Sequence, residues 1–416
     1  MMISMEDKSI LRRLAERYAS IASLDVHQEK AEMWRRLNDL EKVRPMVWVN
    51  EICWNEMNVN DELILRCADP FCRSIEETLR RTIYQWEHLP GDMIVEPVYY
   101  VPLTIHDTGF GISEDVDIVR TDDANDVISR EFHPQISEEK DLNKIKTPEL
   151  TYDAEETEKN CRILSDIFGD ILPVQKRGII CLHFAPWDEL IRWWGVTEAM
   201  MDLILRPELV HAAMDRLVNA YLARLKQWEE LNLFSYSPGN NRVGSGGLGH
   251  TKDLPKPGFN PECVRTCDQW GSATAQIFSD VSPAQHEEFA LQYERRWLNH
   301  FGMNYYGCCE PLHLKMDMLE SVPNLRKISM SPWADVEIMV AKSNGRHVLS
   351  HKPNPAIVAT DDWNPDQARK NIREVLEKVE GHPTEIILKD ISTVRHKPER
   401  LWQWTAIALE EAQRYE

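Results

Sequence analysis

The chain has 416 residues, of which 43% are hydrophobic and 28% are charged, the balance of a folded globular protein. It carries 68 acidic and 48 basic residues, a formal net charge of −20, which disfavours binding to the phosphates of nucleic acids. No apolar run approaches the about 20 residues of a membrane-spanning helix, and the N-terminus shows no signal peptide. The nine cysteines are therefore expected to be reduced thiols in the cytoplasm.

Short apolar runs alternate along the chain with segments of helical periodicity. Helices are predicted at 7–42, 70–88, 188–205, 207–231, 283–300, 311–321, 333–344, 364–379 and 398–415. Strands are predicted at 46–52, 93–100, 178–184, 273–278, 303–307, 325–330, 346–350 and 385–388. Residues 111–160 are polar and strongly acidic, and we interpret them as an excursion between repeating units.

Eight strands separated by helices predict an α/β fold, a (β/α)8 TIM barrel with an N-terminal helical extension and loop insertions. The extension is expected over residues 1–44 and the barrel over residues 45–416. Functional residues of such barrels lie at the carboxyl ends of the strands. The candidates selected by this rule are Glu51, Trp54, His106, Ser279, Asp280, Cys308, Cys309, Glu310, Lys352, Asn354, Lys389 and Asp390.

A glycine-rich stretch, Gly244–Gly249, fits the spacing G-x-G-x-x-G. A dinucleotide site requires a strand before this motif and a helix after it. Here Pro238 and Gly239 precede it and two prolines follow, so no helix is predicted. We interpret residues 237–261 as a long loop that lies flexibly over the barrel mouth.

Two adjacent thiols and a carboxylate, Cys308, Cys309 and Glu310, follow the predicted strand 303–307. Thiolates are soft ligands that suit zinc, and a thiolate is also a nucleophile. The alternative is that one or both cysteines are small buried apolar residues. Because side chains alternate along a strand, one of the two should point into the barrel and the other out of it.

Cationic side chains cluster near the last two predicted strands, with Lys352 after the seventh and Lys389 after the eighth. Cations at a barrel mouth are natural partners of a substrate carboxylate or phosphate. The alternative is that they are solvated surface charges.

Several segments together resemble the uroporphyrinogen decarboxylase superfamily over roughly residues 45–412. They are Ala275–Pro283, Tyr306–Leu312, Ile328–Asp335, Ser350–Pro355 and Lys389–Val394. The superfamily comprises uroporphyrinogen decarboxylases and zinc-dependent methyltransferases that exchange methyl groups with a corrinoid protein or a thiol. The resemblance implies a (β/α)8 barrel on a branch near these methyltransferases.

The chain departs from both groups at their defining motifs. The propionate-binding arginines that follow the first strand in the decarboxylases are replaced by Asn50–Asn55. The His-x-Cys motif of the methyltransferases is Tyr306-Gly307-Cys308 here, and Asp390 stands near their last cysteine. Cys308 is thus the one zinc ligand that the resemblance carries over, with Cys309, Glu310 or Asp390 as candidates to complete the site.

The leading hypothesis is a methyltransferase that moves a methyl group between a small substrate or thiol and the cobalamin of a corrinoid protein docked at the barrel mouth. Glu51, His106 and Asp390 are the candidates for proton transfer. The expected substrate contacts are Trp54, Ser279, Asp280, Lys352, Asn354 and Lys389. Many such barrels are dimers, so a homodimer is one expected assembly, while no nucleic-acid or membrane partner is expected.

Two other hypotheses stay open at this point. One is a decarboxylase or lyase that acts on a carboxylated substrate without corrinoid, through Lys352 and Lys389. The other is a non-catalytic protein that binds a tetrapyrrole or corrinoid.

Overall fold

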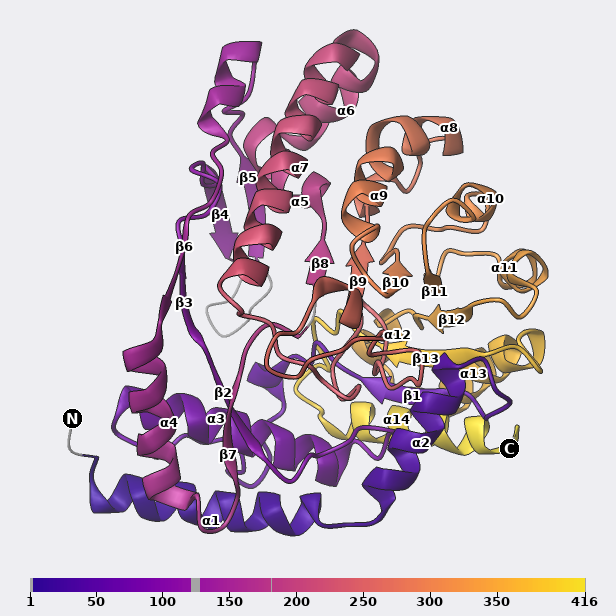
Figure 1. Cartoon of the computed structure of the whole chain (residues 1–416). Helices are drawn as coiled ribbons and strands as arrows, with labels where there is room; N and C mark the ends of the chain where they lie inside the picture. Colours follow the sequence, from indigo (N-terminus) through magenta and orange to yellow (C-terminus); the bar gives the residue numbers. More distant parts are fainter. Residues whose placement is uncertain (1–2, 121–127, 181, 416) are drawn as a thin grey trace.

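A computed structural model describes residues 3–120, 128–180 and 182–415. Its centre is a parallel seven-stranded sheet in the order β1-β13-β12-β11-β10-β9-β8, whose strands turn progressively around a common axis (Figure 1). The strands are β1 (Met46–Val49), β8 (Leu182–Phe184), β9 (Trp270–Ala273), β10 (Met303–Tyr306), β11 (Leu325–Met330), β12 (Val348–His351) and β13 (Thr384–Leu388). Each overlaps a predicted strand, and the α/β class is confirmed.

Helices follow the strands and cover the outside of the sheet (Figure 1). They are α5 (Pro186–Trp194), α6 (Val196–Leu205), α7 (Pro207–Glu230), α8 (Pro283–His286), the π-helical η5 (Glu287–Leu291), α9 (Gln292–Leu298), α10 (Met316–Leu319), α11 (Val336–Ser343), α12 (Ala356–Ala359), α13 (Pro365–Lys378) and α14 (Glu399–Gln413). A proline occupies the first turn of α5, α7, α8 and α13, where its missing N–H has no helical partner to lose.

The sheet does not close into an eight-stranded barrel within the described residues, because β8 and β1 remain its two edges. The predicted second strand, 93–100, was wrong over most of its length. Asp92 lies beside β1, and its carboxylate accepts the N–H of Val47 at 2.7 Å and pairs with Arg44 at 2.8 Å. The Asp92 side chain thus occupies a hydrogen-bonding position at the edge of β1. Pro97 follows five residues later and has no N–H to donate to a strand ladder.

That chain instead leaves the barrel and forms β2 (Tyr99–Pro102), which pairs in parallel with β7 (Val174–Arg177). Of the predicted strand 178–184 only Leu182–Phe184 forms a strand, β8, while Ile179 makes an isolated bridge to Phe234 and Cys181 lies outside the described residues. The predicted fourth strand is displaced, since residues 276–278 form a 3-10 turn, η4, instead.

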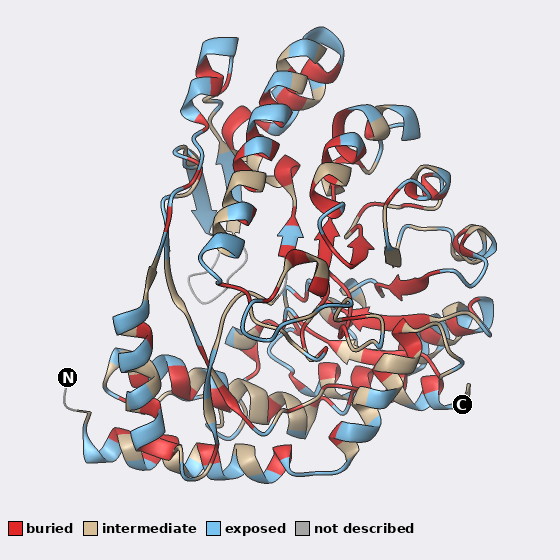
Figure 2. Cartoon of the chain, in the orientation of Figure 1, coloured by how far each residue is buried: buried red, intermediate tan, exposed pale blue. Residues whose placement is uncertain are grey.

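The acidic excursion contains two antiparallel ribbons, β3 (Thr104–Asp107) with β6 (Leu150–Asp153), and β4 (Val116–Arg120) with β5 (Ile128–Phe132). It also contains the 3-10 helix η2 (Glu139–Lys144) and ends in α4 (Ala154–Phe168), a helix that the sequence analysis did not predict. Figure 2 shows β4 and β5 exposed, in contrast to the buried strands of the central sheet. The 121–127 connection lies outside the described residues.

The N-terminal segment forms α1 (Met5–Ala22) and α2 (Val26–Asn38), where one long helix was predicted. Helix α1 packs with α3 (Pro70–His88), α4, β2 and β7 in a core of its own. The side chain of Trp34, from α2, is fully buried among Met46, Leu248 and Val348. Met46 and Val348 begin β1 and β12, so α2 closes the amino ends of these strands.

The inward face of the sheet is unusually polar. Leu349 and Ile386 point outward into the core shared with the helices, so Lys327, Ser350 and Glu385 point inward. Lys327 Nζ lies 2.8 Å from Glu385 Oε2, and both side chains are fully buried. Ser350 donates a hydrogen bond of 2.6 Å to the other oxygen of Glu385.

The glycine-rich stretch lies inside the barrel and not over its mouth, which corrects the sequence-based prediction. Arg242 and Leu248 form an antiparallel bridge, and the Gly247 N–H donates to Glu385 Oε1 at 2.9 Å. A Cβ on Gly246 would lie 2.5 Å from that same oxygen, so only glycine fits against the inward side chains. No helix follows within the described residues 250–265, as predicted.

No helix in the described part of the chain is both long enough and apolar enough to cross a membrane.

Candidate functional site

The carboxyl ends of β1, β10 and β13 carry a cluster of charged and sulfur-containing side chains. Glu51 follows β1, Cys308 and Cys309 follow β10, and Lys389 and Asp390 follow β13. The parallel strands place these ends at one edge of the sheet, and contacts between the side chains join them. The structure therefore brings together five of the residues that the sequence analysis selected.

The two thiols of the cluster lie in contact, with 3.5 Å between the sulfur atoms of Cys308 and Cys309. The prediction that one points into the barrel and the other out was wrong. Gly307, with φ of 95°, ends the extended strand, and the alternation of side chains ends with it.

Glu310 fixes the backbone of this turn through both of its carboxylate oxygens. Its buried carboxylate accepts the N–H of Cys308 at 2.8 Å and the hydroxyl of Thr274 at 2.8 Å. On the other side, Ser329 donates a 2.6 Å hydrogen bond to the carbonyl of Cys308. Glu310 is therefore a positioning residue for the thiol pair.

The two thiols differ in acidity. The pKa of the Cys308 thiol is lowered by the contact with Cys309, and Lys389 and Lys352 add to this effect against the opposing effect of burial. The same contact raises the pKa of Cys309, and burial raises it further. Cys308 is thus the sulfur that ionises first, and Cys309 keeps its proton and lies 3.7 Å from Asp390 Oδ2.

Glu51 and Asp390 are held around the ammonium group of Lys389. Lys389 Nζ lies 2.6 Å from Asp390 Oδ2 and 3.3 Å from Glu51 Oε2, and the Asp390 N–H also donates to Glu51. Burial lowers the pKa of Lys389, but Cys308, Asp390 and Glu51 outweigh it and the net shift is upward. Both acidic residues have positive φ, 51° and 56°, a strained backbone conformation that often marks functional sites.

Arg242 reaches this cluster from the inserted hairpin, with its guanidinium 2.6 Å from Glu51 Oε1. Despite the opposing effect of burial, the side chains of Asp390, Arg242 and Lys389 together lower the pKa of Glu51 to about 2. The sequence analysis missed Arg242, because it lies in a loop whose insertion into the barrel no local pattern indicates.

Lys352 lies below the cluster, fully enclosed by the barrel. Its ammonium donates to Tyr305 Oη at 3.0 Å and to the carbonyl of Ser350 at 2.9 Å. Burial lowers the pKa of Lys352 to about 7, although Glu385 and Cys308 oppose the shift. A substantial fraction of this amine is therefore neutral near pH 7.

Two buried polar side chains at the same end of the sheet have no hydrogen-bond partner. Both amide atoms of Asn50, at the end of β1, and the hydroxyl of Ser331, at the end of β11, are unpaired. Buried polar groups are nearly always hydrogen-bonded, so these two are available to a ligand.

The remaining predicted residues lie outside the cluster. His106 is exposed on β3, in a ribbon with β6 that is separate from the seven-stranded sheet, because the chain leaves the barrel before reaching it. Trp54 packs edge-on against Tyr84 of α3, with 5.9 Å between ring centroids. Asn354 is exposed and accepts the N–H of Ala356 at 3.0 Å.

Ser279 and Asp280 lie beyond η4, on the way to α8. The Ser279 hydroxyl donates to the carbonyl of Gln276 at 2.9 Å, and Asp280 is exposed. Neither has a described hydrogen bond or ion pair with the cluster.

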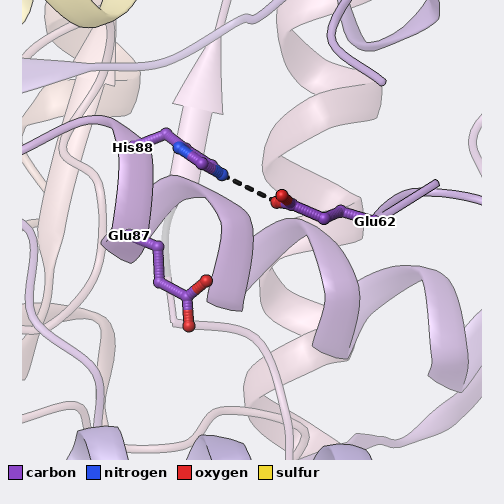
Figure 3. A group of neighbouring side chains, drawn as sticks. All are labelled: Glu62, Glu87 and His88. Atoms are coloured by element: carbon purple, nitrogen blue, oxygen red, sulfur yellow. Dashed lines mark hydrogen bonds and ion pairs between the residues drawn. The ribbon is translucent and has the colours of Figure 1, made fainter. Parts of the chain in front are cut away.

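A second group of possible metal ligands lies on the outside of the barrel, at the end of α3 (Figure 3). Among the described residues, Glu62, Glu87 and His88 are the set of three donor atoms within 4.8 Å of one another. His88 Nε2 already pairs with Glu62 Oε2 at 2.7 Å, and Glu87 pairs with Arg17 at 2.6 Å. These ion pairs account for the arrangement without a metal.

The donor chemistry at the thiol pair suits a soft metal ion. Ligands about 2.3 Å from a tetrahedral zinc lie about 3.7 Å from each other. The sulfur–sulfur distance of 3.5 Å and the 3.7 Å from Cys309 Sγ to Asp390 Oδ2 both match this spacing. Cys308 and Cys309 therefore fit such an ion as a pair of thiolates, whereas the donor atoms of Cys308, Cys309 and Asp390 do not all lie within 4.8 Å of one another.

Neither the protein-family models nor the curated proteins gave a match to this sequence. Among solved structures, a methyltransferase from Methanosarcina mazei matches with 11% sequence identity and a TM-score of 0.51. The match covers 92% of this chain and 98% of that one. At this identity the likeness shows the fold alone, an α/β barrel-like architecture that extends over nearly the whole chain.

Proposed function

We propose that the chain is a methyltransferase of the uroporphyrinogen-decarboxylase-like class, with Cys308 at its reacting centre. The observation that carries the proposal is the pair of contacting thiols at the carboxyl end of β10, of which Cys308 has a lowered pKa. The fold shared with the Methanosarcina mazei methyltransferase supports it. Enzymes on this type of barrel act at this end of the strands.

Cys308 and Cys309 are the residues that would hold a zinc ion, and Asp390 would have to move closer to Cys308 to complete the ligand set. A zinc ion there would supply a Lewis acid that lowers the pKa of a bound thiol or polarises a substrate heteroatom. Glu310 keeps the thiol pair in place through the backbone of Cys308.

The cations of the cluster would orient an anionic small-molecule substrate. Arg242 and Lys389 both hold Glu51 in the present arrangement, and Lys352 adds a second amine beside that of Lys389. Asn50 and Ser331 add unpaired hydrogen-bonding groups. Asp390, 3.7 Å from Cys309 Sγ, and Glu51, which shares the Lys389 ammonium with it, are the proton-transfer candidates, whereas His106 lies away from the cluster on β3.

The methyl group would be exchanged with the cobalamin of a corrinoid-binding protein at the barrel mouth. The corrinoid would supply the methyl group for transfer to a thiol, which a zinc ion held by Cys308 and Cys309 would activate. A cytoplasmic homodimer is the proposed assembly.

The test is demethylation of free methylcobalamin in the presence of a small thiol, followed by its absorption spectrum. We expect turnover by the wild-type chain and its loss in Cys308→Ser, while Cys263→Ser, an exposed cysteine elsewhere, stays active. The absence of turnover with free methylcobalamin and with a methylated corrinoid protein would contradict the proposal.

The second candidate function is a decarboxylase or lyase that uses neither corrinoid nor metal. The observation in its favour is Lys352, a buried amine with a pKa of about 7 near two further cations. An amine that is partly neutral at this pH can form an imine with a keto acid or act as a base. Borohydride trapping of a keto acid on Lys352, abolished in Lys352→Met, would favour this function over methyl transfer.

A further inference from the structure

The contact between Cys308 and Cys309 is unique among the cysteines for which the structure describes contacts. Their sulfur atoms are 3.5 Å apart and both side chains are partly exposed. Cys67 and Cys72 are fully buried, away from any dissolved reagent. Cys263 and Cys267 lie on an outer turn, and neither has a described contact with the other's sulfur.

The surroundings hold the pair together. The hydrogen bonds from Cys308 N–H to Glu310 and from Ser329 to the Cys308 carbonyl fix the peptide on both sides of the first cysteine. A Cβ on Gly307 would lie 2.5 Å from Leu312 Cδ1, so the turn is also packed against its neighbours. Thiols held in contact in this way react with each other more readily than thiols that must first find one another.

We propose that Cys308 and Cys309 form a site of reversible oxidation, which a hydroperoxide converts into a disulfide between the two adjacent residues. One cysteine sulfur attacks a peroxide oxygen, the oxygen–oxygen bond breaks, and a sulfenic acid and one molecule of water or alcohol form. The second sulfur then attacks the sulfenic sulfur and displaces water. In total the two thiols lose two protons and two electrons, and these reduce the hydroperoxide to water and an alcohol, or to two waters in the case of hydrogen peroxide.

The disulfide is expected to be easily reduced. Adjacent Cα atoms are about 3.8 Å apart, closer than the about 4.4–6.8 Å that disulfides prefer. The bond is therefore strained, and strained, accessible disulfides are the labile ones that ordinary thiols reopen. A reversible modification site follows, distinct from a structural cross-link.

The consequence for activity rests on the proposed function. Oxidation removes both soft donors from the cluster at once, so a methyltransferase that depends on Cys308 would be inactive until reduced. The oxidation chemistry itself needs neither zinc nor corrinoid, so it can be tested separately.

The experiment treats the full-length chain with stoichiometric hydrogen peroxide, blocks free thiols and analyses tryptic peptides by mass spectrometry. The peptide from Trp297 to Lys315 contains Cys308 and Cys309 and no other cysteine. We expect this peptide to lose the mass of two hydrogens and to regain them, with both thiols, after dithiothreitol. The outer pair, Cys263 and Cys267, serves as the internal control and should stay reduced.

Two variants sharpen the result. In Cys308→Ser and in Cys309→Ala the remaining sulfur has no partner, so we expect a sulfenic acid that dimedone traps in whichever variant folds. The proposal is overturned if the wild-type peptide gains oxygen without losing two hydrogens, if it stays reduced, or if the disulfides formed involve other cysteines. The peptide analysis does not depend on the outcome of the methylcobalamin assay, so failure of this proposal and failure of the proposed function can be distinguished.

Discussion

Glu294 of α9 is a carboxyl group with no exposure to solvent, behind the strand that carries the thiol pair. Tyr306 donates a 2.6 Å hydrogen bond to its Oε2, whereas Oε1 has no partner. Burial raises the pKa of Glu294 to about 8, since the hydrogen bond from Tyr306 offsets only part of that effect and the charge of Glu310 adds to it. Glu294 therefore keeps its proton at neutral pH in the folded chain.

This proton makes the free energy of unfolding depend on pH. The unfolded chain releases it near pH 4.5 and the folded chain near pH 8, so the stabilisation is full below pH 4.5 and is lost as pH rises to 8. As pH rises over this range, we expect the free energy of unfolding of Glu294→Gln to increase relative to that of wild type by up to about 1.4 kcal/mol per pH unit. Urea unfolding between pH 5 and pH 8 measures the difference, with the exposed Glu155→Gln as control.

A constant difference between Glu294→Gln and wild type across this pH range would show that Glu294 is ionised in the folded chain.

At the scale of elements, the local patterns of the sequence were sufficient for most of the barrel. Most strands of the seven-stranded sheet lie in runs that the sequence analysis selected, although β9 shares only Ala273 with its predicted run. The residues after β1, β10 and β13 followed from the barrel rule. The second strand failed because Asp92 takes up the edge of β1 by its side chain, and no periodicity indicates such a contact. His106 was misplaced as a consequence.

Arg242 was missed for a related reason. Its place depends on a hairpin that enters the barrel between inward side chains of β10, β12 and β13. Those partners are more than 60 residues away in sequence, and several are polar side chains that look like surface residues until the fold is known. The glycine-rich sequence indicates that the backbone packs closely against another part of the protein, but it does not identify that part.

The hairpin and the strands meet at the buried pair of Lys327 and Glu385, whose loss we expect to be costly. Glu385→Gln would leave the Lys327 ammonium buried without a counter-charge, at a cost of about 3–5 kcal/mol of unfolding free energy. The exposed pair of Lys342 and Asp317 is the matched control, since Asp317→Asn should cost less than about 1 kcal/mol. Urea denaturation of both variants gives the comparison, and equal losses would refute a special role for the buried pair.

At the scale of the whole molecule, helix α2 closes the amino end of the central sheet. Trp34 of α2 is fully buried and donates a 2.8 Å hydrogen bond to the carbonyl of Asp92. Its ring packs closely against Gly247, where an added Cβ would lie 2.3 Å from the ring. One side chain thus joins the helical segment, the edge of β1 and the inserted hairpin.

We expect Trp34→Ala to destabilise the chain by about 3–5 kcal/mol, because it opens a large cavity beneath the barrel. Trp333→Ala is the control: this side chain is 69% exposed, and its loss should change stability by less than about 0.5 kcal/mol. Chemical denaturation followed by circular dichroism measures both. A small effect of Trp34→Ala would mean that residues 1–44 are an appendage with little part in the barrel.

The central claim is that the thiol pair at the carboxyl end of β10 is a metal-binding reacting centre, and the metal content of the purified chain tests it most directly. Elemental analysis of wild type, Cys308→Ser and the control Cys263→Ser should find about one zinc per chain in the first and third and none in Cys308→Ser. Well-folded wild-type protein that binds no zinc, even when zinc is supplied, would contradict the claim. The chemistry would then be assigned to Lys352, Lys389 and Asp390.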